Sequence, residues 1–277
     1  MAATNPDKAP DRADVLFHNL FDGSAERRYE LIADGLRVIR LNTSRLLSDA
    51  KLLASAERFC SARFLITTAR EESAKYYILL DACRLDFMKH HDIIRQLCKA
   101  SYSHIAKHAY LEVQGYPELE NMGRVMEAWE IAVRKWWPAS PESGEPSMPH
   151  DTVFDREYPL YVDISDYSRT WLLPNNETQR AYFMDVLGHN PIKAVEDVVR
   201  LLTEADEAGL IQPECLRTIG SVFENHYVGD QASRNIVDKL HRKAAERLKT
   251  ECGISEERYL RSTFVQWPLY HCVTKGY

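Results

Sequence analysis

The chain has 277 residues, a mass of 32.0 kDa and a formal net charge of -6 at neutral pH, with 45% hydrophobic and 27% charged residues. These values are ordinary for a globular protein, and the acidic balance argues against broad, non-specific attraction to nucleic acid while leaving room for a local basic site. The mean hydropathy of -0.40 and the lack of a long uncharged apolar run exclude a membrane span.

The chain is predicted to begin with a disordered leader over residues 1–22. Residues 1–14 are polar, contain two prolines and lack the apolar segment of a secretory signal. The six cysteines include no Cys-x-x-Cys pair, a pattern that favours free thiols in a reducing compartment. We therefore expect a cytoplasmic protein.

A four-helix core is predicted over residues 23–137, because apolar residues recur there at steps of three and four. The expected helices cover about residues 26–54, 55–80, 91–113 and 119–137, and Pro138 stops the last of them. Four consecutive helices favour an up-and-down bundle.

A linker rich in proline and serine is predicted over residues 138–157. Residues 158–277 are expected to form a C-terminal helical subdomain that packs on the core. Its helical patterns cover about residues 176–188, 191–208, 213–226 and 230–251, after a short extended segment at 161–164. No pattern indicates a sizeable sheet, so the predicted fold class is all-α.

Two acids and a lysine, Glu71, Glu72 and Lys75, interrupt the second predicted helix where its apolar pattern continues on both sides. Glu71 and Lys75 are four residues apart with the acid first, the favourable order for an ion pair along a helix. The ordinary alternative is a solvated surface pair, which contributes only about 0.3–0.5 kcal/mol. Charges on an otherwise apolar face instead indicate a paired or functional site.

The next predicted helix carries His104, Lys107 and His108. A histidine can act as acid or base near neutral pH, and a lysine can hold a phosphate oxygen. His104 and His108 share a face and could ligate a metal, but the sequence has no Glu-x-x-His and no His-Glu-x-x-His motif. We therefore expect no metal and no cofactor.

A cationic stretch follows Arg84 and contains few acids. Its candidate nucleic-acid-binding residues are Arg84, His90, His91, Arg95 and Lys99. Arg84 with His90 or His91 could place a guanidinium and an imidazole around one phosphate, although this spacing also arises by chance. The commoner outcome for such a stretch is a charged face in solvent.

Several motifs together resemble the AbiV family of abortive infection proteins, over about residues 36–187. They are Leu46-Leu47-x-x-Ala50-x-Leu52-Leu53, Ala69-x-Glu71-Glu72-x-x-Lys75, Ser103-His104-x-x-Lys107, and Leu160-Tyr161-Val162-Asp163 followed by Trp171 and Pro174. The order and spacing of these motifs make the resemblance more specific than any one of them.

The resemblance implies an all-helical, HEPN-like core in a bacterial anti-phage protein that forms a homodimer. Many HEPN proteins are metal-independent ribonucleases whose arginine and histidine flank the scissile phosphate. Glu71, Glu72, Lys75, His104 and Lys107 match the family pattern. The HEPN arginine–histidine motif matches only loosely, at Arg84 with His90 or His91. Leu85 replaces the usual polar residue after the arginine, and Ala74 stands where the family often has glycine.

Two hypotheses follow. In the first, the protein is a ribonuclease toxin in which His104 is the general base or acid, Lys107 and Lys75 face the phosphate, and Glu71 or Glu72 orients the lysines. In the second, it is a non-catalytic module that senses a phage protein or arrests translation by binding, and the same polar residues fix helix register. The expected partners are RNA, a phage protein and a second copy of the chain.

Overall fold

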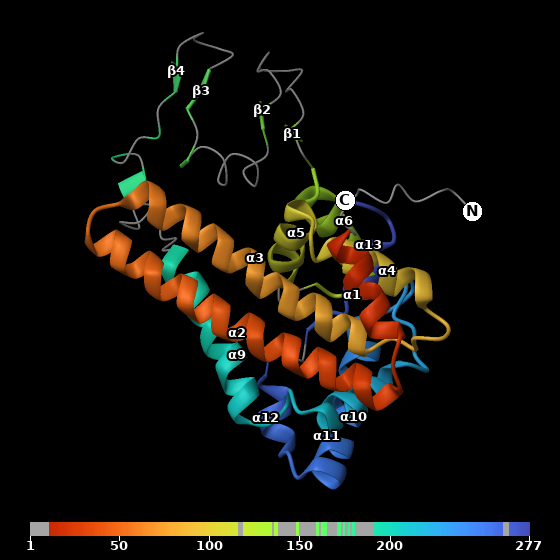
Figure 1. Cartoon of the computed structure of the whole chain (residues 1–277). Helices are drawn as coiled ribbons and strands as arrows, with labels where there is room; N and C mark the ends of the chain where they lie inside the picture. The colour runs from red at the N-terminus through yellow and green to blue at the C-terminus, as the bar shows by residue number, and fades with distance from the viewer. Residues whose placement is uncertain are drawn as a thin grey trace.

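The computed structural model describes most of the helical part of the chain (Figure 1). The described residues are 11–115, 119–134, 136–137, 148–149, 159–160, 162–164, 171–172, 174, 177, 179–180, 191–262 and 266–277. No helix among them is long and apolar enough to cross a membrane.

The first described element is a helix, α1 (Arg12–Phe21), so the predicted disordered leader is wrong from residue 12 onward. The Asp11 side chain caps this helix by accepting a hydrogen bond from the Ala13 amide at 2.9 Å. Ala13, Phe17 and Leu20 then recur at helical spacing and are buried. The polar composition of residues 1–14 concealed this short amphipathic stripe. Residues 1–10 lie outside the described part.

Two long helices, α2 (Ala25–Ser55) and α3 (Phe59–Cys83), form an antiparallel hairpin along the length of the molecule (Figure 1). The prediction of a helix over residues 26–54 is confirmed to within one residue at each end. The Ser24 side chain caps α2 by accepting from the Arg27 amide. The second half of α3 is buried on nearly every side, so this helix is the central element of the core.

The single helix expected over residues 91–113 is two helices, α4 (His91–Ala100) and α5 (His104–Gln114). The turn forms at residues 101–103, where the Ser103 side chain accepts a hydrogen bond from the Ala106 amide and caps α5. His104 therefore begins a helix instead of lying within one. The next helix is α6 (Met122–Ala132).

Two pairs of two-residue antiparallel strands follow. β1 (Trp136–Trp137) pairs with β2 (Met148–Pro149), and β3 (Asp163–Ile164) pairs with β4 (Trp171–Leu172). β3 lies within the segment predicted to be extended. Most of the predicted linker over residues 138–157, and most of the helix expected at 176–188, lie outside the described residues.

The C-terminal part adds the remaining described helices. They are α9 (Pro191–Glu207), α10 (Pro213–Phe223), α11 (Arg234–Cys252), α12 (Glu256–Leu260) and α13 (Tyr270–Val273). Pro213 occupies the first turn of α10, and Gly253 ends α11 with a positive φ of 71°, which an L side chain rarely adopts. The helical patterns predicted at 191–208, 213–226 and 230–251 are confirmed.

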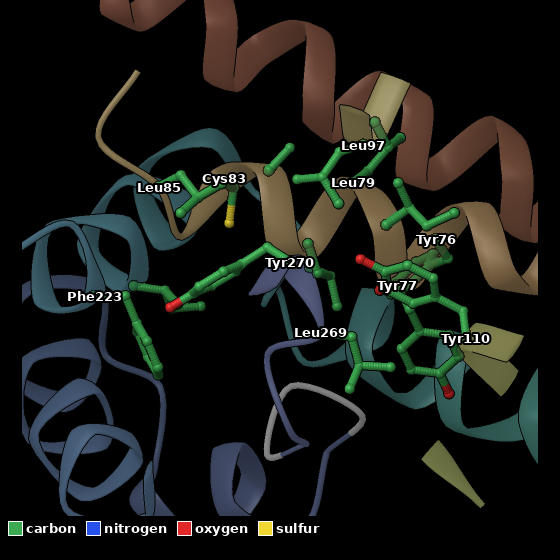
Figure 2. Packing of buried hydrophobic residues seen from close by; sticks show 14 of the residues in the cluster. Tyr76, Tyr77, Leu79, Cys83, Leu85, Leu97, Tyr110, Phe223, Leu269 and Tyr270 are labelled. Carbon is green, nitrogen blue, oxygen red and sulfur yellow. The ribbon is translucent and has the colours of Figure 1, made fainter. Parts of the chain in front are cut away.

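These C-terminal helices share one hydrophobic core with the N-terminal bundle. Figure 2 shows residues of this core from both parts, including Tyr110 beside Leu269, and Tyr270 between Cys83 and Phe223. The approach of α10 to the end of α3 is so close that a Cβ atom on Gly220 would lie 2.5 Å from the Cys83 carbonyl oxygen. The all-α prediction is confirmed, and the C-terminal helices extend the bundle as part of its core.

Candidate functional site at the interface of α3 and α5

A cluster of ionisable side chains joins α3 to the first turn of α5. One carboxylate oxygen of Glu71 accepts two hydrogen bonds, from His104 Nδ1 at 2.6 Å and from Lys107 Nζ at 2.8 Å. His104 and Lys107 are three residues apart, so both project from the same side of α5 toward α3. We call Glu71, His104 and Lys107 the α3–α5 triad.

The three members of the triad differ in their exposure to solvent. The side chain of Lys107 is 6% exposed and that of Glu71 is 13% exposed, whereas that of His104 is 41% exposed. The Lys107 ammonium and the Glu71 carboxylate therefore neutralise each other inside the interface. The imidazole of His104 is the part of the triad that a ligand can reach.

The hydrogen bond from His104 sets the protonation pattern of its ring. An ionised carboxylate can only accept, so Glu71 places a proton on Nδ1. In the neutral imidazole, Nε2 then carries the lone pair. A carboxylate behind a histidine holds the ring orientation and stabilises its protonated form, so this geometry suits proton transfer at Nε2.

Glu72 and Lys75 form a separate pair on the same helix. Lys75 Nζ lies 2.5 Å from Glu72 Oε1, and the amide of Asn42 on α2 donates to Glu72 Oε2 at 3.3 Å. The ion pair that the structure gives Lys75 is thus at spacing i, i+3 with Glu72, where the sequence indicated Glu71. The Lys75 ammonium also lies 5.8 Å from the ring centroid of Tyr102, beside the start of α5.

Asn42 is a neighbour of the site that sequence reasoning missed. Asn42 lies on α2, thirty residues before its partner Glu72, and no local spacing links the two. Its signal in the sequence is a polar amide between Ile39 and Leu46, inside a helix with an apolar stripe. Tyr102 is 42% exposed and lies in the turn that separates α4 from α5.

Arg84 lies in the core, which corrects its assignment to a nucleic-acid-binding surface. Its side chain is 3% exposed, and Nη1 donates to Asp81 Oδ1 at 2.8 Å. Asp81 also accepts from the Tyr110 hydroxyl at 3.1 Å and from the Leu269 amide at 2.7 Å. Burial raises the pKa of Asp81 to about 6, although Arg84 and the hydrogen bonds oppose that rise. The guanidinium is therefore not available to a phosphate.

Three of the other four candidate nucleic-acid-binding residues contact neighbouring side chains. His90 is half-buried and stacks on Tyr227, with ring centroids 5.4 Å apart. His91 makes an edge contact with Phe17 of α1, and Arg95 donates to Asp14 of α1 at 3.1 Å. Lys99 is exposed on α4. The helix α1, which lies in the segment predicted to be disordered, thus contacts His91 and Arg95 of the cationic stretch.

The donor set of the triad does not suit a divalent metal ion. The shared Glu71 oxygen already receives an ammonium and an imidazole N–H, which leaves one carboxylate as the anionic group of the triad. No group of three or more His, Cys, Asp or Glu side chains with metal-binding geometry occurs within the part of the chain that the structure describes.

Comparison with known families matches residues 31–190, more than half of the chain, to the AbiV model, a HEPN family. The chain belongs to the AbiV family. It is thus an abortive-infection protein of the HEPN type, and the resemblance stated from the motifs is confirmed. No curated protein and no solved structure was found to match the chain.

The AbiV match runs from α2 past α6 and ends where α9 begins. Every member of the α3–α5 triad lies inside it, as do Glu72 and Lys75. The helix α1 and the helices α9 to α13 lie outside it, although they complete the same core.

Proposed function

We propose that this AbiV-family protein is an effector of anti-phage abortive infection that cleaves RNA without a metal ion. The observation that carries the proposal is the α3–α5 triad, in which a partly exposed imidazole is held by a buried carboxylate that is neutralised by a buried lysine. RNA supplies its own nucleophile, the 2′-hydroxyl, so a positioned base, a proton donor and a cation are sufficient.

His104 takes the central role in this mechanism. Its Nε2 accepts the proton of the 2′-hydroxyl, and Glu71 stabilises the imidazolium that results. The 2′-oxygen attacks phosphorus, the bond from phosphorus to the 5′-oxygen breaks, and the leaving oxygen takes up a proton.

The two lysines play different parts. The side chain of Lys75 is 25% exposed, so its ammonium is the cation that faces the phosphate and can donate a proton to the leaving oxygen. Lys107 is buried and acts through Glu71, whose charge it balances. Glu72 orients Lys75 from the same helix.

We infer the cellular setting from the family. The partners proposed are RNA as substrate, a phage protein as activator or inhibitor, and a second copy of the chain in a homodimer. The proposed place of action is the bacterial cytoplasm, where phage and host transcripts are translated. A toxin of this kind has to stay silent until infection.

The decisive experiment compares RNA cleavage by the purified wild-type protein and by His104→Ala, with lysates of infected cells added to supply the trigger. Loss of a general base costs about 10²- to 10⁴-fold in rate. His18→Ala is the matched control, because His18 is an exposed histidine on α1, outside the triad. Equal cleavage by wild type and His104→Ala would remove His104 from the chemistry.

A second candidate function is a non-catalytic module that acts by binding a phage protein. The observation in its favour is the burial of Lys107 and Glu71, because a buried ion pair can serve to fix the register of two helices. Lys107→Met distinguishes the two functions. A lower melting temperature together with unchanged phage protection and no RNA cleavage by the wild type would favour the module.

A further inference from the structure

A chain of three hydrogen-bonded side chains lies outside the AbiV match, between the loop after α10 and the helix α13. His271 Nε2 contacts Asp230 Oδ1 at 2.5 Å, and His271 Nδ1 contacts the Tyr227 hydroxyl at 2.9 Å. The side chain of His271 is 10% exposed, whereas Asp230 is 61% exposed and Tyr227 is 42% exposed. Tyr227 and Asp230 are therefore exposed residues on either side of a largely buried imidazole.

The direction of the two hydrogen bonds makes His271 a base toward Tyr227. The Asp230 carboxylate can only accept, so the proton of the neutral ring lies on Nε2. The lone pair on Nδ1 then accepts the hydrogen bond of the Tyr227 hydroxyl. A hydroxyl, a base within hydrogen-bond reach and a third group that orients the base form the general arrangement of an activated nucleophile.

The ring of Tyr227 is held in place from several sides. His90 stacks on it with an interplanar angle of 19°, and the ring of Tyr270 lies against it with centroids 5.5 Å apart. Gly229 provides the space, because a Cβ atom at that position would lie 3.1 Å from the tyrosine ring. A fixed ring keeps the hydroxyl at His271, and this pre-organisation is what separates a reactive hydroxyl from an ordinary surface tyrosine.

We propose that Tyr227 is an acceptor site for acyl transfer, with His271 as the general base and Asp230 as the residue that positions it. In the reaction, a bond forms between Tyr227 Oη and the acyl carbon, and the bond between that carbon and its leaving group breaks. The phenol proton passes to His271 Nδ1, and the leaving group departs with the electron pair.

The charges around the tyrosine explain why a base is needed and why the donor is an uncharged acyl compound. Burial and the negative charge of Asp230 raise the pKa of Tyr227, so the phenol keeps its proton at neutral pH without help. The hydrogen bond from His271 lowers the pKa of Asp230, which keeps that carboxylate ionised. The Lys275 ammonium lies 4.0 Å from Asp230 Oδ2 and offsets part of this negative charge, and an uncharged acyl donor adds none to it.

The test measures acetylation of individual tyrosines in the full-length protein by N-acetylimidazole, followed by peptide mass spectrometry. Tyr102 is an internal reference, because it has the same exposed fraction of 42% and is separate from the His271 and Asp230 pair. We expect Tyr227 to react at least about tenfold faster than Tyr102, since general bases contribute about 10²- to 10⁴-fold in enzymes. Tyr227→Phe verifies the assignment of the modified peptide.

Variants of the base and of its positioning residue complete the test. His271→Gln should bring the rate at Tyr227 down to that of Tyr102 and leave Tyr102 unchanged. Asp230→Ala, at a position that is 61% exposed, should lower the rate at Tyr227, and Asp230→Glu should restore part of it. Equal rates at Tyr227 and Tyr102 in the wild type, or a rate at Tyr227 that none of these variants changes, would overturn the proposal. This readout is independent of RNA cleavage.

Discussion

The helix α3 carries two acid–base clusters ten residues apart, and both reach α5. At Glu71 the partners are His104 and Lys107, and at Asp81 they are Arg84 and Tyr110. The first cluster includes an imidazole that is 41% exposed, whereas the Asp81 and Arg84 side chains are 1% and 3% exposed. Of the two acid–base clusters on α3, the one at Glu71 is thus accessible to ligands and the one at Asp81 is buried.

The difference comes from the C-terminal segment. The amide of Leu269 donates to Asp81, and Figure 2 shows Leu269 and Tyr270 against α3 near this point. The same segment is fixed to the bundle by hydrogen bonds from Gln114 to the Trp267 carbonyl and from Trp129 to the Gly276 carbonyl. Residues outside the AbiV match therefore contribute to the burial of the Asp81 cluster.

The largest effect is expected for Asp81→Ala. Removal of one partner of a buried ion pair leaves an uncompensated charge on Arg84, and such changes cost about 3–5 kcal/mol of unfolding free energy. Chemical denaturation of both proteins at neutral pH measures the loss. The matched control is Asp34→Ala, because Asp34 pairs with Arg37 at the same spacing of i, i+3 and at 2.9 Å on the exposed surface of α2.

The control variant should lose no more than about 1 kcal/mol, the usual range for exposed ion pairs. Similar losses for the two variants would show that the closure of the Asp81 cluster has no energetic consequence. The burial of the Asp81 cluster would then not distinguish it energetically from an exposed ion pair.

The second prediction concerns pH. The pKa of Asp81 is raised to about 6 in the folded protein by burial, whereas it lies near 3.8 when the residue is exposed. Between these values the folded state binds more protons than the unfolded state, so the contribution of Asp81 to stability falls as the pH rises from about 4 to 6. The stability difference between wild type and Asp81→Asn should change by roughly 2–3 kcal/mol over that interval.

Equilibrium denaturation of wild type and Asp81→Asn in parallel at several pH values between 4 and 7 measures this difference. The comparison cancels the titration of all other groups that the substitution leaves unchanged. A difference that stays constant, or that grows as the pH rises, contradicts the assignment of a buried carboxyl with a raised pKa.

The sequence predicts the long helices and names the residues of the α3–α5 triad, because local spacing records both. It pairs Lys75 with Glu71, however, whereas the structure pairs Lys75 with Glu72. The hairpin of α2 and α3 follows from apolar residues at steps of three and four, and the meeting of Glu71 with His104 and Lys107 follows from charges on two neighbouring amphipathic helices. The chemical roles of these residues stay predictions.

The sequence could not reveal the buried cluster of Asp81, Arg84 and Tyr110, or the residue at which α5 begins. Arg84 looks like a surface cation, and its burial depends on Leu269 and Phe223, which lie more than a hundred residues away. Ser103 was part of a matching motif, yet the apolar pattern continues across it and predicted one helix where there are two. Tertiary contacts and a single capping side chain decided both points.

The prediction with the smallest expected effect tests how the α3–α5 triad is positioned. Ser103→Ala removes the cap of α5, which should cost about 1 kcal/mol of unfolding free energy and loosen the first turn, where His104 and Lys107 lie. Ser24→Ala is the matched control, because Ser24 makes the same cap contact of 3.3 Å at the start of α2, away from the triad. If α5 positions the triad, both variants lose similar stability and only Ser103→Ala also slows RNA cleavage. Equal cleavage by the two variants would show that the cap of α5 does not affect the reaction.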